Sequence, residues 1–292
     1  MNWDQTGLRS ENSTNTSENY DYLKFNPKPI EMYVFIDPFC PECWYFEPYF
    51  KKLSMEYGRF FTIRPIVSSS LNRETLCKPI KSMDYWKKIT RQLDTELNEG
   101  SEKAISSPWR VSLAIKAAEI QGMKAGRAFL RKIQEYLFLR KDDISKEDIL
   151  MNIAKEAKLD MEEFSEDLYS ATAKKAIQCD LQLTHEMEIE DTPTIVFFNH
   201  STDAQGIKIS GLYPYEVYEF ILQETLQTIP IPSEKPPLEE LLKKYDVVGT
   251  KEISIIYDWP ISKAEKEMKK LQFKQKVNRM SSKRGTFWKY LD

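Results

Sequence analysis

Cysteine and histidine are scarce in this sequence, which has 4 Cys and 2 His among its 292 residues. Four cysteines in so long a chain do not form a disulfide scaffold, and a reducing compartment would keep most of them as thiols. A structural zinc site needs four nitrogen or sulfur ligands, usually in two separated pairs. The sequence offers one close pair, at Cys40 and Cys43, so we expect no metal and no cofactor.

Long apolar runs are also missing. No uninterrupted apolar stretch approaches the ~20 residues that a membrane-spanning helix needs. Residues 1–28 are rich in Asn, Asp, Ser, Thr and Glu and lack the apolar region of a secretory signal. We therefore expect a flexible polar tail here and a cytoplasmic protein. The net charge of −3 gives no global field that favours nucleic acid or a membrane surface.

The stretch from residue 32 to 46 carries the clearest signal in the chain. The apolar run Tyr33–Ile36 stops at Asp37-Pro38, a Cys-x-x-Cys pair follows at Cys40 and Cys43, and an amphipathic helical pattern begins there. This order is typical of thioredoxin-like proteins. A helix N-terminus carries about half a positive charge and free N–H groups, so it stabilises a thiolate. We interpret the two cysteines as redox candidates, with Cys40 as the exposed attacking thiol.

The remaining pattern predicts an α/β protein, a thioredoxin fold with a helical insertion at about 72–188. This domain is expected to span residues 29–229. Its predicted strands and flanking helices lie at about 31–37, 41–57, 60–67, 194–198, 205–210 and 214–228. Without the helical block they read β-α-β and then β-β-α, which is the thioredoxin core. In this fold Thr192-Pro193 should be a cis peptide facing the cysteines, because only X–Pro bonds adopt the cis form at low energy.

A proline-rich stretch separates this domain from the rest of the chain. Residues 230–237 contain four prolines and are predicted to be a semi-rigid linker. Beyond it, residues 238–292 predict three helices and a terminal hairpin, which together describe a winged-helix-like domain. The expected helices cover 238–245, about 251–257 after a Thr250 cap, and about 263–275 after a Ser262 cap.

This C-terminal segment is locally basic. Lysines cluster on or just past its third helix, at Lys263, Lys266, Lys269, Lys270, Lys274 and Lys276. The cluster is compatible with DNA binding by a recognition helix, with an acidic protein partner, or with a solvated helix face. Glu265 and Glu267 interrupt the basic stripe, so we do not expect nucleic acid.

Three motifs resemble those of a known family. Phe35 to Trp44 (Phe-Ile-Asp-Pro-Phe-Cys-Pro-Glu-Cys-Trp), Ser107 to Arg110 and Thr192 to Thr194 are similar to the DsbA/FrnE branch of the thioredoxin superfamily. Within that branch, the Cys-Pro-Glu-Cys-Trp form and the C-terminal segment resemble the SpxH (YjbH) family of Firmicutes adaptors. Relatives often begin with a zinc-binding His- and Cys-rich segment, but residues 1–28 contain neither residue type.

The resemblance implies a non-enzymatic role. Such an adaptor binds the transcriptional regulator Spx, promotes its degradation by the ClpXP protease, and relaxes this control under thiol or aggregation stress. ClpX and Spx are therefore the expected partners, with no membrane partner. The alternative function is a cytosolic thiol-disulfide oxidoreductase of the DsbA/FrnE type.

The role of the cysteine pair stays open at this point. It could form a reversible disulfide that modulates binding, turn over as an oxidoreductase, or be a retained fold feature. Its motif neighbours are Pro41, Glu42 and Trp44. A carboxylate at Glu42 disfavours a nearby thiolate, which makes the pair a weaker oxidant.

The other candidate ligands are scattered. A zinc site at the pair would need Cys77, Cys179 and His185 to converge on it from the helical block. We expect Cys179 to be a buried, inert thiol, because it lies on an apolar helical stripe with Ala176 and Leu183. At Pro193, the preceding backbone could pair with an extended client peptide, or the cis bond could serve only as a rigid turn.

Overall fold

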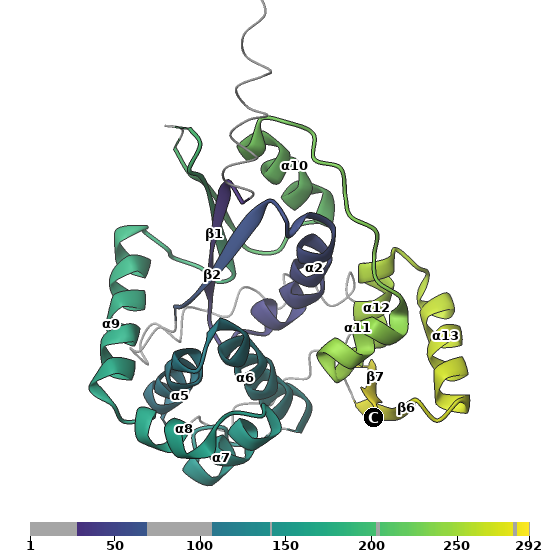
Figure 1. Cartoon of the computed structure of the whole chain (residues 1–292), viewed down its shortest axis with the longest axis horizontal. Helices are drawn as coiled ribbons and strands as arrows, with labels where there is room; N and C mark the ends of the chain where they lie inside the picture. Colours follow the sequence, from purple (N-terminus) through teal and green to yellow (C-terminus); the bar gives the residue numbers. More distant parts are fainter. Residues whose placement is uncertain (1–27, 69–106, 141, 203–204, 283–284, 292) are drawn as a thin grey trace, which may run out of the picture.

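The computed structural model describes residues 28–68, 107–140, 142–202, 205–282 and 285–291 (Figure 1). The predicted polar tail, except for residue 28, lies outside these ranges. So does the first part of the predicted helical block, at 69–106. Within the described ranges, every helix is too short or too polar to cross a lipid bilayer.

The first sheet has four strands in the order β2-β1-β3-β4. β1 (Ile30–Ile36) pairs in parallel with β2 (Phe61–Val67) and antiparallel with β3 (Thr194–Asn199), and β4 (Ile207–Ser210) forms the far edge. The central strand β1 is buried along almost its whole length, which is why it reads as a continuous apolar run. Pro65 is tolerated in β2 because that strand lies at an edge, where a backbone N–H is dispensable.

Helices cover both faces of this sheet. Figure 1 shows α9 (Ala171–Glu186) on one side and α2 (Pro41–Tyr57) with α10 (Tyr215–Leu226) on the other. Alternate side chains of β1 serve the two sides. Phe35 packs toward α9, whereas the even-numbered apolar residues pack in one core with α2 and α10. The predicted β-α-β and β-β-α halves therefore form a single sheet.

The described part of the helical block lies between β2 and β3. It comprises α5 (Pro108–Ile120), α6 (Met123–Glu135) with the π-helical turn Tyr136–Arg140, α7 (Glu147–Glu156), α8 (Met161–Asp167) and α9. Its core is continuous with the sheet domain, because Trp44 and Tyr45 of α2 and Val67 of β2 belong to the same buried cluster. The block is thus packed onto the sheet domain and is not an independent bundle.

Residues 238–291, which we call the C-terminal unit, hold a second sheet with the strand order β5-β7-β6. The elements follow one another as α11 (Leu238–Tyr245), β5 (Val247–Gly249), α12 (Thr250–Tyr257), α13 (Ile261–Phe273), β6 (Val277–Ser282) and β7 (Gly285–Tyr290). All strand pairs are antiparallel. The unit has its own apolar cluster, which includes Leu242, Ile253, Met268 and Trp288.

The two predicted helix caps in this unit are wrong. Gly249 and Pro260 hold the N-cap positions, so Thr250 and Ser262 lie inside their helices. The Thr250 hydroxyl has other partners, because it accepts a hydrogen bond from the Trp288 indole (2.8 Å) and donates one to the Thr286 carbonyl (3.2 Å). A tertiary contact thus uses the group that the local pattern assigned to capping.

Candidate functional site

The two cysteines lie where β1 turns into α2. Cys40 is the N-cap residue of α2, Pro41 is its first helical residue, and Cys43 lies in the first turn. The connecting turn is held by Asp37, whose carboxylate accepts from the Phe39 N–H (2.9 Å) and whose carbonyl accepts from the Cys40 N–H (3.1 Å). Both cysteines are free thiols; Cys40 is half-buried and Cys43 is buried.

The predicted partner of the cysteines on the opposite strand lies beside them. The Thr192–Pro193 peptide bond is cis, and it directly precedes β3. The Cys40 thiol donates to the Thr192 carbonyl across a distance of 3.5 Å. The Pro193 carbonyl in turn accepts from the Gly211 N–H (2.8 Å), which fixes the backbone at this point. Residues 152 positions apart in the sequence thereby form one site.

Burial controls the acid–base chemistry of this site. It raises the pKa of the Cys43 thiol well above its usual value, and the neighbouring Cys40 adds to this effect. The Asp37 N–H, which donates to the Cys43 sulfur (3.4 Å), opposes the shift only in part. Burial also raises the pKa of the Asp37 carboxyl to about 6, against the hydrogen bond from Phe39. Cys43 therefore stays protonated at neutral pH, and Cys40 is the more accessible sulfur.

Trp44, which follows the second cysteine, reaches away from the site toward the C-terminal unit. Its ring lies 5.8 Å from that of Phe138 and 6.4 Å from that of Phe287 on β7. The Arg131 guanidinium stacks on it at 4.1 Å from the ring centroid. The sequence predicts Trp44 only as a neighbour of the Cys-x-x-Cys motif, because Phe138, Phe287 and Arg131 lie far from it along the chain. Glu42, a second motif neighbour, is buried.

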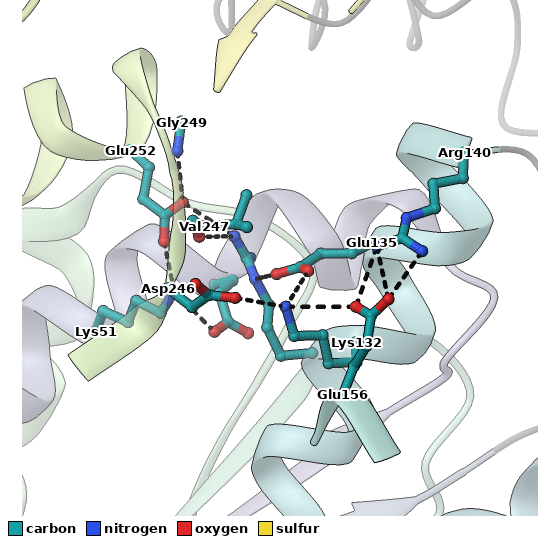
Figure 2. Close-up of polar contacts among 11 residues, drawn as sticks. Lys51, Lys132, Glu135, Arg140, Glu156, Asp246, Val247, Gly249 and Glu252 are labelled. Carbon is teal, nitrogen blue, oxygen red and sulfur yellow. Dashed lines mark hydrogen bonds and ion pairs between the residues drawn. The ribbon is translucent and has the colours of Figure 1, made fainter. Parts of the chain in front are cut away.

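A buried charge network continues from this point (Figure 2). Glu252 of α12 pairs with Lys51 of α2 (2.5 Å) and with Arg131 of α6 (3.2 Å). Asp246 of the C-terminal unit pairs with Lys132 (3.0 Å). Glu252 also accepts from the Gly249 N–H, and Arg131 donates to the Val247 carbonyl. The network therefore joins the dithiol helix, the helical block and the C-terminal unit.

Electrostatics favour the ionised form of Glu252 strongly. Burial alone would raise its pKa, but Arg131 and Lys51 outweigh that effect and hold the pKa at about 2. This role of Glu252 cannot be predicted from the sequence, because a glutamate in a first helical turn is an ordinary capping residue. Glu252 becomes the centre of a network because the fold brings Lys51 of α2 and Arg131 of α6 to its carboxylate.

Two further predictions concern candidate metal ligands. Cys179 is exposed, so the expectation of a buried thiol is wrong. The buried stripe of α9 runs through Ala173, Ile177 and Asp180, which leaves Cys179 outside it. His185 is exposed as well, and Cys77 falls outside the described ranges. Across the described ranges, no three His, Cys, Asp or Glu side chains cluster as a metal site.

The comparisons with known proteins agree with this geometry. The profile of a family described as thioredoxin matches residues 33–220. A putative protein disulfide isomerase from Nitrosomonas europaea superimposes with a TM-score of 0.56 at 18% identity, over 68% of this chain and 98% of that one. At this identity the likeness concerns the fold. The family match, the fold and the site together define a thioredoxin-like protein.

Two relatives match far beyond the thioredoxin region. The ClpXP adapter protein SpxH of Bacillus licheniformis is 46% identical over 270 residues, which cover 91% of this chain and 90% of that protein. The ClpXP adapter protein SpxH of Bacillus subtilis is 46% identical over 271 residues, which cover 90% of each chain. The chain belongs to the SpxH family of ClpXP adapter proteins.

Proposed function

We propose that this chain is a cytoplasmic adaptor that binds the transcriptional regulator Spx and presents it to the ClpXP protease. The observation that carries the proposal is the identity of 46% to adapter proteins over about nine-tenths of both chains. A match over nine-tenths of the chain must extend into the C-terminal unit, which the thioredoxin match does not reach. A shared thioredoxin core alone would not separate an adaptor from an oxidoreductase.

The order of elements in the C-terminal unit supports the proposed winged-helix-like domain. One helix, a short strand, two helices and a hairpin follow one another, and the three strands form one antiparallel sheet. In the proposed adaptor, this domain and the thioredoxin-like domain form one scaffold with two separate surfaces. An adaptor needs such surfaces because it contacts its client and the unfoldase at the same time.

The alternative is a cytosolic thiol-disulfide oxidoreductase, and the placement of Cys40 beside the cis-proline favours it. In such an enzyme the Cys40 thiolate attacks a client disulfide, and Cys43 then resolves the mixed disulfide as a thiolate. Burial raises the pKa of the Cys43 thiol, so in that step the resolving sulfur would have to lose its proton before it attacks. We propose that the pair runs no catalytic cycle and that Spx binding depends on contacts outside it, because the match to adapter proteins covers about nine-tenths of both chains.

The double variant Cys40→Ala/Cys43→Ala separates the two functions. We expect it to bind purified Spx within about twofold of the wild-type affinity, because the two substitutions leave the contacts outside the cysteine pair unchanged. It should also stimulate degradation of Spx by ClpXP in vitro. Titration calorimetry measures the binding, and reduction of insulin by dithiothreitol serves as the oxidoreductase assay. Loss of all Spx binding in the double variant, or catalytic insulin reduction by the wild type, would contradict the proposal.

A further inference from the structure

The outer face of α13 combines an aromatic side chain with lysines. α13 packs on its own unit through Ala264, Met268 and Leu271, which recur with the spacing of one helix face. Phe273 comes nine residues after Ala264, which is two and a half helical turns, and so lies on the opposite side. Its side chain is 94% exposed. Figure 1 shows α13 at the outer edge of the C-terminal unit, away from α2.

Three lysines of α13 share the outward side of the helix with Phe273. Lys266 lies on the same outward side as Phe273, and Lys269 and Lys270 lie to its two sides. All three are exposed. Four lysines and two glutamates give the helix a net charge of +2. The long aliphatic parts of the lysines extend the apolar surface around the ring, and their ammonium groups form a positive rim.

Two glutamates limit what this face can bind. Glu265 pairs with Lys269 (3.8 Å) and Glu267 pairs with Lys270 (2.7 Å). A surface for a phosphate backbone gains affinity from uninterrupted positive charge, and each carboxylate at its edge repels phosphates. A protein helix with a few carboxylates around one aliphatic residue matches the pattern better, because its charges are sparse and its apolar centre meets Phe273.

We propose that the outer face of α13, formed by Lys266, Lys269, Lys270 and Phe273, docks an acidic amphipathic helix of a protein partner. An aliphatic side chain of that helix covers the Phe273 ring, and its carboxylates pair with the surrounding lysines. The surface lies on the C-terminal unit and does not include the dithiol or the cis-proline. The inference goes beyond the proposed Spx-binding function and holds whichever protein supplies the helix.

A labelled model peptide tests the docking on the full chain. The probe is a helical peptide of about four turns, with leucines at i, i+3 and i+7 and glutamates on both sides of them. Fluorescence anisotropy should show saturable binding that weakens as salt rises from about 0.05 M to about 0.5 M. A peptide of the same composition in scrambled order should bind at least about fivefold more weakly, because it has no continuous apolar stripe.

Substitutions on the two sides of the molecule locate the binding. Phe273→Ala should weaken binding at least about fivefold, and Lys266→Glu with Lys270→Glu at least about tenfold. Matched controls are Phe220→Ala, at a ring 60% exposed on α10, and Lys174→Glu with Lys175→Glu on the exposed side of α9. These should change the affinity less than about twofold.

Several outcomes would overturn the proposal. One is absence of peptide binding by the wild-type chain, and another is equal loss in the α13 and control variants. A third is tighter binding of a DNA duplex of similar charge that depends on the same lysines, which would make the face a nucleic-acid surface. A fourth is self-association of the chain that Phe273→Ala abolishes, which would assign the face to a second copy. Unchanged thermal unfolding of the variants ensures that lost binding is local.

Discussion

Glu252 is an ionised carboxylate inside the protein, and its charge is balanced by side chains from two other helices. Because Arg131 and Lys51 outweigh the burial penalty, its pKa is about 2, below the ordinary value of 4.5. A carboxyl with a lowered pKa in the folded state stabilises that state above its unfolded pKa. The contribution is therefore complete above pH 4.5 and is lost as the pH falls toward 2.

We predict that Glu252→Gln lowers the free energy of unfolding by about 3–5 kcal/mol at pH 7, because it leaves Arg131 and Lys51 buried without their counter-charge. Asp258→Asn is the matched control. Asp258 also pairs with a lysine of α2, Lys52 (2.6 Å), but its side chain is 59% exposed. Its loss should cost less than about 1 kcal/mol. Urea unfolding followed by circular dichroism measures both.

The same pair of variants carries a pH signature. The deficit of Glu252→Gln relative to the wild type should shrink between pH 4.5 and 2, where Glu252 itself becomes neutral. Equal losses in the two variants at pH 7, or a Glu252→Gln deficit that stays constant at acid pH, would contradict the assigned role of this network.

At the scale of elements, α2 shows what the sequence could and could not predict. Its range, 41–57, follows from local signals, with Pro41 at the first position and Gly58 after the last. The packing around α2 does not follow from local signals. The pattern of Trp44, Phe46, Phe50 and Leu53 indicates a helix with one buried face and one solvated face. In the structure the charged residues Lys51, Lys52 and Glu56 are buried too, because the C-terminal unit and the linker cover them.

Other elements show the same contrast between features set by nearby residues and features set by distant contacts. The helix 238–245 and the terminal hairpin are specified by nearby residues, and the sequence predicts both. The predicted cap of α12 is wrong, because Thr250 bonds to Trp288 and Thr286 on a distant strand. Cys179 was placed on the wrong face, because α9 orients its Asp180 toward Lys116 and the Val67 N–H. Long-range pairing decides these cases.

The contacts of Trp44 yield a prediction for α2 as an element. Trp44→Ala should lower the free energy of unfolding by about 3–5 kcal/mol, because it opens a cavity between Phe138, Phe287 and Arg131. Trp259→Ala is the control. That ring is half-buried and stacks on Tyr257 at 4.8 Å, so its loss should cost less than about 2 kcal/mol. Urea unfolding measures the loss of unfolding free energy in both variants. A loss for Trp44→Ala no larger than that for Trp259→Ala would contradict the prediction.

At the scale of the whole molecule, the linker and the C-terminal unit are both attached to α2. The Ser233 N–H donates to the Glu56 carbonyl (2.7 Å), and Lys235 pairs with the Glu56 carboxylate (2.9 Å). Val247 and Phe287 of the C-terminal unit enter the apolar cluster of the helical block. The position of the unit is thus fixed by buried side chains as well as by the chain connection.

This arrangement predicts that the C-terminal unit stays bound after its covalent link is cut. A protease recognition site inserted between Pro232 and Ser233 allows cleavage of the folded protein. The two fragments should elute together in gel filtration at neutral pH, including at about 1 M salt, because buried ion pairs are screened much less than exposed ones. In the Glu252→Gln background they should separate, since the unpaired Arg131 and Lys51 gain hydration when the interface opens. Separation of the wild-type fragments would mean that the linker, and not the Glu252 network, holds the unit in place.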